Sequence, residues 1–193
     1  MLLLRSIALL LAMLSVVPAA YAQTQAPNEP VTHLGLTFPT EIAGAPRISV
    51  RVYEPGMGYS AGYRHGEATS TVYIYDNGLP SIPDDIRSAV VRGQFEREKA
   101  EVGHVPQLGI SAKAKNGFTI QDSSKRDRLM CQAYVMTREG FGQYDTFMCL
   151  GVYNGKFFKV RTTIPQSANA EPEMRRFTGL WVDRLWSSPA AGR

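Results

Sequence analysis

The chain has few of the residues that metal sites and most catalytic sites require. It contains two cysteines and three histidines in 193 residues. The histidines, His33, His65 and His104, are scattered and do not have the spacing of metal ligands. The best match to a dinucleotide-binding motif, residues 56–61, is not followed by a predicted helix. We therefore expect no metal site and no cofactor.

Long hydrophobic runs and a strong excess of one charge are also lacking. No apolar run after the N-terminus is long enough to span a bilayer, so no transmembrane segment is expected. The formal net charge is +4, from 21 basic and 17 acidic residues. A balance this mild does not indicate a nucleic-acid partner.

The N-terminus has the organisation of a secretory signal peptide. Arg5 precedes an apolar run over residues 7–17, and Ala20-Tyr21-Ala22 forms an A-x-A cleavage site. Residues 1–22 are predicted to be removed, which leaves 171 of the 193 residues. We expect a periplasmic or secreted protein with a disordered lead-in over 23–30, a single domain over 31–187 and a flexible tail over 188–193.

The C-terminal half predicts a three-stranded meander over residues 129–164. Asn154-Gly155 separates two β-rich runs, a strong signal for a hairpin with a type I′ turn. That turn sets a register in which Val152 faces Phe157 and Cys149 faces Val160. Cys131 and Cys149 are equidistant from Gly140, as cross-strand neighbours in the first hairpin would be. In an oxidising compartment, we expect these two cysteines to form a disulfide.

The rest of the chain predicts further strands and two helices. Strands are expected over 31–38, 47–54, 59–64 and 69–76, with Ile48, Val50 and Val52 on the buried face of the second. Asn116-Gly117 predicts another hairpin turn. The first helix is expected to begin at Asp84 or Asp85 and to run to about residue 102, with an apolar side formed by Ile86, Val90, Val91 and Phe95.

The C-terminal helix has the clearer pattern. Asn169 is a plausible N-cap and Pro172 suits the first turn. Its apolar stripe consists of Met174, Phe177, Trp181 and Leu185. We expect a single α+β domain: a twisted, mainly antiparallel sheet of seven to nine strands with two helices, the C-terminal one packed on the sheet.

One segment matches a hydrolase motif. Gly58-Tyr59-Ser60-Ala61-Gly62 fits G-x-S-x-G, and a histidine, His65 or His104, could serve as the base. The motif requires a helix immediately after the serine, whereas the residues after Ser60 predict strands. We expect no catalytic residue here and keep a small serine hydrolase using Ser60 as an alternative.

Five segments of the N-terminal third resemble a group of uncharacterised small secreted proteobacterial proteins. These segments are residues 38–44, 52–54, 58–60, 63–64 and 71–76, the last reading Thr-Val-Tyr-Ile-Tyr-Asp. The resemblance implies export and brings no activity. The order of the elements is also similar, more distantly, to the Mog1/PsbP-like α+β fold, whose members mostly bind or assemble proteins.

These observations favour a non-enzymatic periplasmic binding or interaction protein. Its partner is an unknown protein, an envelope component or a small ligand. Exposed tyrosines suit interfaces, so we predict that the binding residues are Tyr53, Tyr59, Tyr63, His65, Glu67, Tyr73 and Tyr75. A purely structural factor in envelope maintenance is a further alternative.

Overall fold

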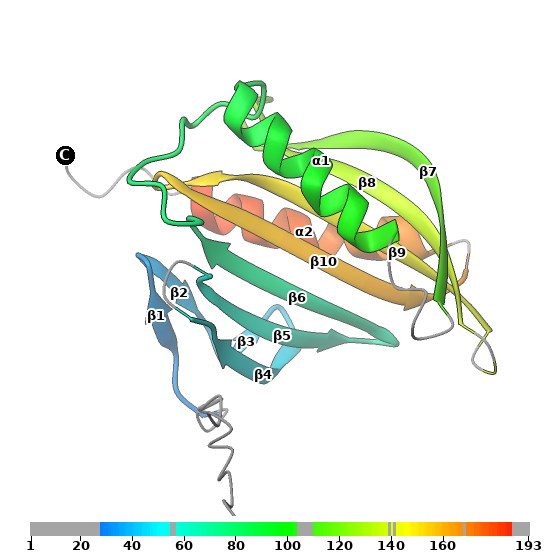
Figure 1. The fold of residues 1–193 in the computed structure, drawn as a ribbon. Coiled ribbons are helices and arrows are strands. Elements are labelled where there is room, and N and C mark those ends of the chain that lie inside the picture. Colours follow the sequence, from blue (N-terminus) through cyan, green and yellow to red (C-terminus); the bar gives the residue numbers. More distant parts are fainter. Residues whose placement is uncertain are drawn as a thin grey trace, which may run out of the picture.

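The computed structural model describes residues 28–54, 57–103, 110–138, 140, 142–167 and 169–186. The predicted signal peptide, most of the lead-in, His104 and the predicted tail lie outside these residues. The described chain forms a single α+β domain, as predicted, with two helices and a mainly antiparallel sheet (Figure 1).

Eight strands form the main sheet, in the order β3-β4-β5-β6-β10-β9-β8-β7. Every strand pair in it is antiparallel. Their bounds are β3 Glu41–Ile42, β4 Ala45–Val52, β5 Tyr59–His65, β6 Ala68–Tyr75, β7 Ile110–Gln121, β8 Asp127–Arg138, β9 Gly142–Tyr153 and β10 Lys156–Pro165. The pairing of β6 with β10 joins the N-terminal strands to the meander.

The predicted meander and its register are confirmed. Phe157 pairs with Val152, and Val160 pairs with Cys149. Asn154 and Gly155 have φ angles of 49° and 69°, the positive values that a type I′ turn requires. Cys131 pairs with Cys149 across β8 and β9, and the two form a disulfide with a Cα–Cα distance of 4.1 Å.

The two helices cover opposite faces of the sheet (Figure 1). Helix α2, Ala170–Trp186, packs into a core cluster that contains the disulfide, Phe147 and Phe158. Helix α1, Ala89–Gly103, lies over a second cluster that contains Met148, Leu150 and Phe157. Because both faces are covered, β9 is buried from Asp145 to Val152 without the usual alternation of buried and exposed residues.

The prediction for α2 is confirmed. Met174, Phe177 and Trp181 are buried at 2% exposure or less, and Leu185 packs partly buried against the same cluster. The backbone N–H of Glu173 donates to the carbonyl of Asn169, closing the first turn. The stripe is apolar over the full length of the helix, so burial alone can fix α2 on the sheet.

The prediction for α1 is wrong at its N-terminus. The helix begins at Ala89, because Asp85 accepts from the N–H of Arg87 in a turn and Ser88 Oγ accepts from Val91 N as the cap. This start leaves Val90 42% exposed instead of buried. The side chains that α1 buries are Val91, Gln94, Glu98 and Val102, with Phe95 half-buried.

Two N-terminal predictions also need correction. Residues 31–38 form a hairpin, β1 Val31–His33 and β2 Leu36–Phe38, because Leu34 and Gly35 adopt positive φ angles. In β4 the pairing with β5 shifts between Arg47 and Ser49. This bulge breaks the predicted alternation at Ile48, which is 41% exposed while Val50 is buried. Val52, the last residue of β4, is 43% exposed.

Asn116-Gly117 does not form the predicted hairpin turn. Residues 110–121 form one strand, β7, and its register against β8 shifts between Ala114 and Gly117. Two residues, Lys115 and Asn116, therefore stand opposite the single Ala133. Neither Asn116 nor Gly117 has the positive φ angle that a type I′ turn requires, so these two residues continue the strand through the bulge.

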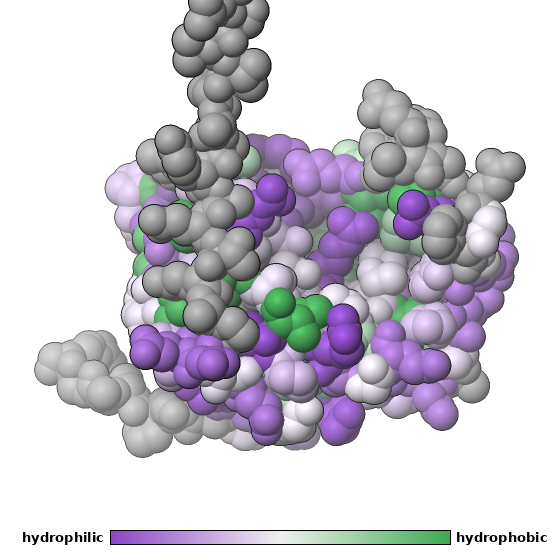
Figure 2. All heavy atoms as spheres, turned by 90° about the horizontal axis from the view of Figure 1, so that it is seen from below, coloured by the Kyte–Doolittle hydropathy of each residue, from purple (hydrophilic) through white to green (hydrophobic). Residues whose placement is uncertain are grey.

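The surface seen in Figure 2 is mostly hydrophilic, and hydrophobic side chains occur on it only as small separate groups. Six large hydrophobic side chains of the described residues are exposed: Leu34, Ile48, Val52, Met57, Leu79 and Val90. Their distribution becomes important for the site below.

The disulfide should contribute a large share of the stability, because it closes a loop between positions 18 apart in sequence. We expect the Cys131→Ala, Cys149→Ala double variant to lose about 3 kcal/mol of unfolding free energy. Urea denaturation of both proteins, with and without reductant, measures the loss. Reductant should lower the stability of the parent and leave the variant unchanged, and a loss below about 1 kcal/mol would contradict the expectation.

Candidate functional site

The predicted binding tyrosines lie on two opposite faces of the sheet, not on one. Tyr59 and Tyr63 face α2 and are 1% and 0% exposed, so the prediction that they form an exposed contact surface is wrong. Tyr63 packs edge-on against Trp181 and donates from its hydroxyl to the carbonyl of Pro39. Both side chains belong to the core because β5 is an inner strand covered by α2, which the strand's own sequence does not reveal.

His65 is also buried beneath α2, at 6% exposure, while Glu67 is exposed in the β5–β6 turn. The imidazole stacks on Phe177 at 4.4 Å between ring centroids. Its Nδ1 lies 3.2 Å from Glu173 Oε1, and its Nε2 lies 2.7 Å from Ser70 Oγ. Ser70 is 0% exposed, so this chain of polar groups ties α2 to the sheet and offers no open nucleophile.

The hydrogen-bond directions in this chain follow from the acceptor-only carboxylate of Glu173. Nδ1 of His65 must carry the proton that it donates to Glu173. In the neutral imidazole, Nε2 then accepts from the hydroxyl of Ser70. Ser70 in turn accepts from Thr162 Oγ1, at 2.6 Å. Burial lowers the pKa of His65, although the bond to Glu173 opposes the shift, which agrees with a neutral ring.

Ser60 lies on the face opposite His65. It is the second residue of β5, 4% exposed, and its Oγ is 3.1 Å from the hydroxyl of Tyr53. The G-x-S-x-G segment is thus a strand, and no strand-to-helix elbow forms at the serine. A Cβ at position 62 would lie 2.5 Å from Ser49 Oγ, so a larger residue than glycine would require the Ser49 side chain to move.

The structure does bring Tyr53, Tyr73 and Tyr75 together, at the edge of α1. They line a pocket of about 260 Å³ between the helix and the sheet. The other lining residues are Met57, Asn77, Gln94, Arg97, Glu98, Glu101 and Lys159. The three tyrosines were predicted from the sequence as binding residues, whereas the polar residues that α1 and β10 contribute were not.

A buried ion pair forms the inner wall of this pocket. Glu98 is 5% exposed and accepts three hydrogen bonds: from Lys159 Nζ at 2.6 Å, from the Tyr75 hydroxyl at 2.5 Å and from Gln94 Nε2 at 3.0 Å. The ammonium of Lys159 also lies 4.5 Å from the ring centroid of Tyr73. All the charged and polar groups here are satisfied by one another, as burial requires.

The pKa values of these groups are displaced by their surroundings. Burial alone would raise the pKa of Glu98, but the charge of Lys159 and the hydrogen bonds outweigh it and lower that pKa. Burial, reinforced by the charge of Glu98, raises the pKa of Tyr75. Burial also raises the pKa of Tyr73. The site therefore holds a fixed Lys159–Glu98 pair and neutral tyrosines at neutral pH.

A second pocket of about 280 Å³ adjoins the first and shares Asn77, Gln94 and Arg97 with it. Its remaining lining residues are Leu79, Ala89, Val90, Gly93 and Phe157. We call the two pockets together the α1 groove. Three of the six exposed large hydrophobic side chains, Met57, Leu79 and Val90, line it. Arg97 stands where the pockets meet and forms no ion pair with a described residue.

The sequence carried a signal for this site that was missed. Gln94 and Glu98 are polar residues at i and i+4, in line with Val91 and Val102 on the buried side of α1. A glutamate in such a stripe needs a buried cation, and Lys159, between Phe158 and Val160 in β10, is the matching residue.

The described part of the chain contains neither a cluster of metal ligands nor a helix that could span a membrane. No group of three or more His, Cys, Asp or Glu side chains in this part of the chain is arranged to hold a metal ion. No helix within the same residues has both the length and the apolar character needed to cross a membrane.

Comparison of the chain with protein-family models gives no match, and a search of curated proteins gives no significant relative. Functional inference for this chain therefore depends on its geometry.

The buried, neutral His65 should make stability depend on pH. The unfolded chain binds a proton at a pKa of about 6.5, whereas the folded chain binds it only at lower pH. Unfolding free energy should therefore fall as pH decreases from about 7.5 to 5.5. In the His65→Gln variant, this pH-dependent decrease in unfolding free energy should be smaller. The control variant His33→Gln should show the same decrease as the parent. Urea titrations at the two pH values measure it, and a slope unaffected by His65→Gln would contradict the assignment.

Removing one partner of the Lys159–Glu98 pair should be more harmful than removing both. Lys159→Met leaves Glu98 buried without its cation, and we expect a loss of about 3–5 kcal/mol of unfolding free energy. The Lys159→Met, Glu98→Gln double variant should recover a large part of that loss, because the buried charge is gone. Thermal or urea unfolding of the single and double variants measures the coupling, and strictly additive effects would show that the two charges do not interact.

Proposed function

We propose that this chain is a non-enzymatic periplasmic binding protein that holds an extended polypeptide segment of a partner in the α1 groove. The observation that carries the proposal is the gathering of Met57, Leu79 and Val90, three of the six exposed large hydrophobic side chains of the described residues, in pockets that Arg97 also lines. Exposed apolar groups that gather in this way are typical of interaction sites.

The size of the two pockets favours a polypeptide over a small molecule. Each measures less than 300 Å³, below the usual 300–1,000 Å³ of a ligand pocket. Two small adjoining pockets suit side chains on the same face of one extended chain, which are alternate residues of its sequence. Val90 lines one pocket and Met57 the other, and Arg97 lines both.

This arrangement specifies the partner segment. Two apolar side chains would fill the pockets, and an acidic residue between them would pair with Arg97, whose guanidinium binds carboxylates in bidentate fashion. The buried pair of Glu98 and Lys159 keeps the inner wall rigid. Tyr53 and Tyr73 add the amphipathic contact area that interfaces use.

The predicted signal peptide and the disulfide support placing this activity outside the cytoplasm. The burial of Ser60 within β5 and of Ser70 beneath α2 favours binding over hydrolysis at either residue.

A displayed peptide library, selected on the immobilised chain, tests the proposal directly. We expect enrichment of peptides in which an acidic residue lies between two apolar residues. Their affinity should fall at least about tenfold, the effect of losing one charged contact, in Arg97→Glu. Arg92→Glu removes an exposed arginine of the same helix that does not line the groove, and this control should bind as the parent does. Equal binding to Arg97→Glu, or no enriched peptide, would refute the proposal.

A further inference from the structure

A separate cavity lies on the opposite face of the sheet, beside the N-terminal end of α2. It measures about 610 Å³, well within the range of small-ligand sites. Its lining residues come from β7, β8, β9 and the segment that leads into α2: Lys115, Asn116, Gly117, Phe118, Ala133, Asp145, Phe147, Ser167 and Glu171. We call it the bulge pocket, after the bulge at residues 115–116.

We infer that the bulge pocket binds a zwitterionic ligand of amino-acid to dipeptide size that carries an apolar side chain. Nothing in the function proposed for the α1 groove requires this site. The two lie on opposite faces of the sheet and share no lining residue.

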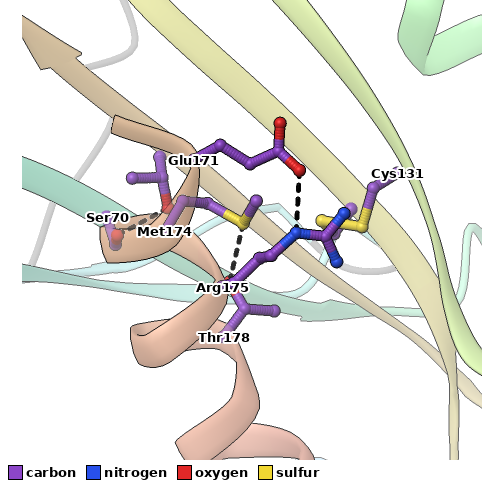
Figure 3. The surroundings of a disulfide bond; sticks show 8 residues. Ser70, Cys131, Glu171, Met174, Arg175 and Thr178 are labelled. Carbon is purple, nitrogen blue, oxygen red and sulfur yellow. Dashed lines mark hydrogen bonds and ion pairs between the residues drawn. A yellow bond between two sulfur atoms is a disulfide. The ribbon is translucent and has the colours of Figure 1, made fainter. Parts of the chain in front are cut away.

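The apolar part of the pocket is held in a fixed position by the disulfide. Ala133 pairs with Phe147, two residues along from the Cys131–Cys149 pair. Phe118 pairs with Cys131 on the other side of β8. Figure 3 shows the surroundings of the disulfide, where α2 carries Glu171 and Arg175 above the sheet. A covalent link between β8 and β9 therefore fixes the surface on which an apolar side chain would pack.

The bulge in β7 supplies the polar part. Because two residues stand opposite Ala133, Lys115 is placed where its ammonium lies 2.7 Å from Asp145 Oδ1. The side chain of Asp145 is only 5% exposed, whereas that of Lys115 is 46% exposed. Bulges commonly re-aim side chains in this way beside functional sites.

A second opposite-charge pair borders the same cavity. Arg175 Nε donates to Glu171 Oε1 at 2.8 Å, drawn as a dashed line in Figure 3. The guanidinium of Arg175 also lies 4.0 Å from the ring centroid of Phe118. The aromatic ring is thereby held from one side by Arg175.

These charges decide which ligand fits. A plain anion would meet the carboxylates of Asp145 and Glu171, and a plain cation would meet the ammonium of Lys115. A zwitterion avoids both conflicts, because its carboxylate can accept from Lys115 while its ammonium donates to Asp145. An ammonium group has three donors and an ionised carboxylate about four acceptor positions, so the Lys115–Asp145 pair retains capacity for both contacts.

Four derivatives with the same benzyl group separate the possible charge requirements. L-phenylalanine is the zwitterion, N-acetyl-L-phenylalanine the anion, L-phenylalaninamide the cation and N-acetyl-L-phenylalaninamide the neutral form. We expect L-phenylalanine to bind at least tenfold more tightly than each of the others. Titrations of the purified chain followed by amide NMR should show the largest shifts at Asn116, Gly117 and Phe118.

Charge removal should change the preference in a defined direction. In Lys115→Met the contact for the ligand carboxylate is lost, so L-phenylalaninamide should bind at least as tightly as L-phenylalanine. Lys113→Met removes an exposed lysine of the same strand that does not line the cavity, and it should keep the parent preference. Lys115→Met leaves the Asp145 carboxylate, whose side chain is 5% exposed, without its cation, so we expect some loss of stability. The unfolding midpoint of the variant verifies that it is folded at the temperature of the titration.

Three results would overturn the inference. The first is the absence of binding by L-phenylalanine up to about 10 mM, which corresponds to negligible affinity. The second is binding of any capped derivative as tight as that of L-phenylalanine, which would show that the pocket does not require both the ammonium and the carboxylate of the ligand. The third is an unchanged preference in Lys115→Met. Arg97→Glu should leave the L-phenylalanine titration unaltered, so a failure at the α1 groove and a failure at the bulge pocket remain distinguishable.

Discussion

The pairing of β8 with β9 at Cys131 and Cys149 is the constraint on which the rest of the structure depends. Side chains alternate between the faces of a strand, so a slip of one residue would exchange the two cores. The disulfide fixes the register at one point. From there Phe147 faces α2 and Met148 faces α1. The hairpin at Asn154-Gly155 carries the same register into β10, which joins the N-terminal strands through β6.

Each helix is held to the sheet by packing and by one buried polar arrangement. On the α2 side, His65 connects Ser70 of β6 to Glu173 of the helix. On the α1 side, Glu98 connects the helix to Lys159 and Tyr75. Such buried polar groups contribute little net stability to the fold. They do disfavour any other placement of the helix, because each polar group would then be buried without its hydrogen-bond partner. This matters more for α1, whose buried stripe is partly polar.

The two proposed sites use the two kinds of surface that this architecture leaves open. The α1 groove arises because α1, in which six of 15 residues are charged, covers its face of the sheet incompletely and leaves Met57, Leu79 and Val90 exposed. The bulge pocket arises where β7 departs from regular pairing near the start of α2. The α1 groove consists of two small adjoining pockets and suits an extended polypeptide, whereas the bulge pocket is a single larger cavity and suits a compact charged ligand.

The sequence by itself determined the local features whose physics acts over a few residues: the type I′ turn at Asn154-Gly155, the cysteine pairing, the stripe of α2 and the α+β class. It did not determine which side of a strand would be covered, so Tyr59 and Tyr63 were predicted to be exposed although α2 buries them. Asn116-Gly117 permits a turn or a bulge, and only pairing with β8 decided between them. Tertiary structure also brought Lys159 to Glu98 and Lys115 to Asp145, because such contacts join residues that are distant in sequence and whose energy depends on burial.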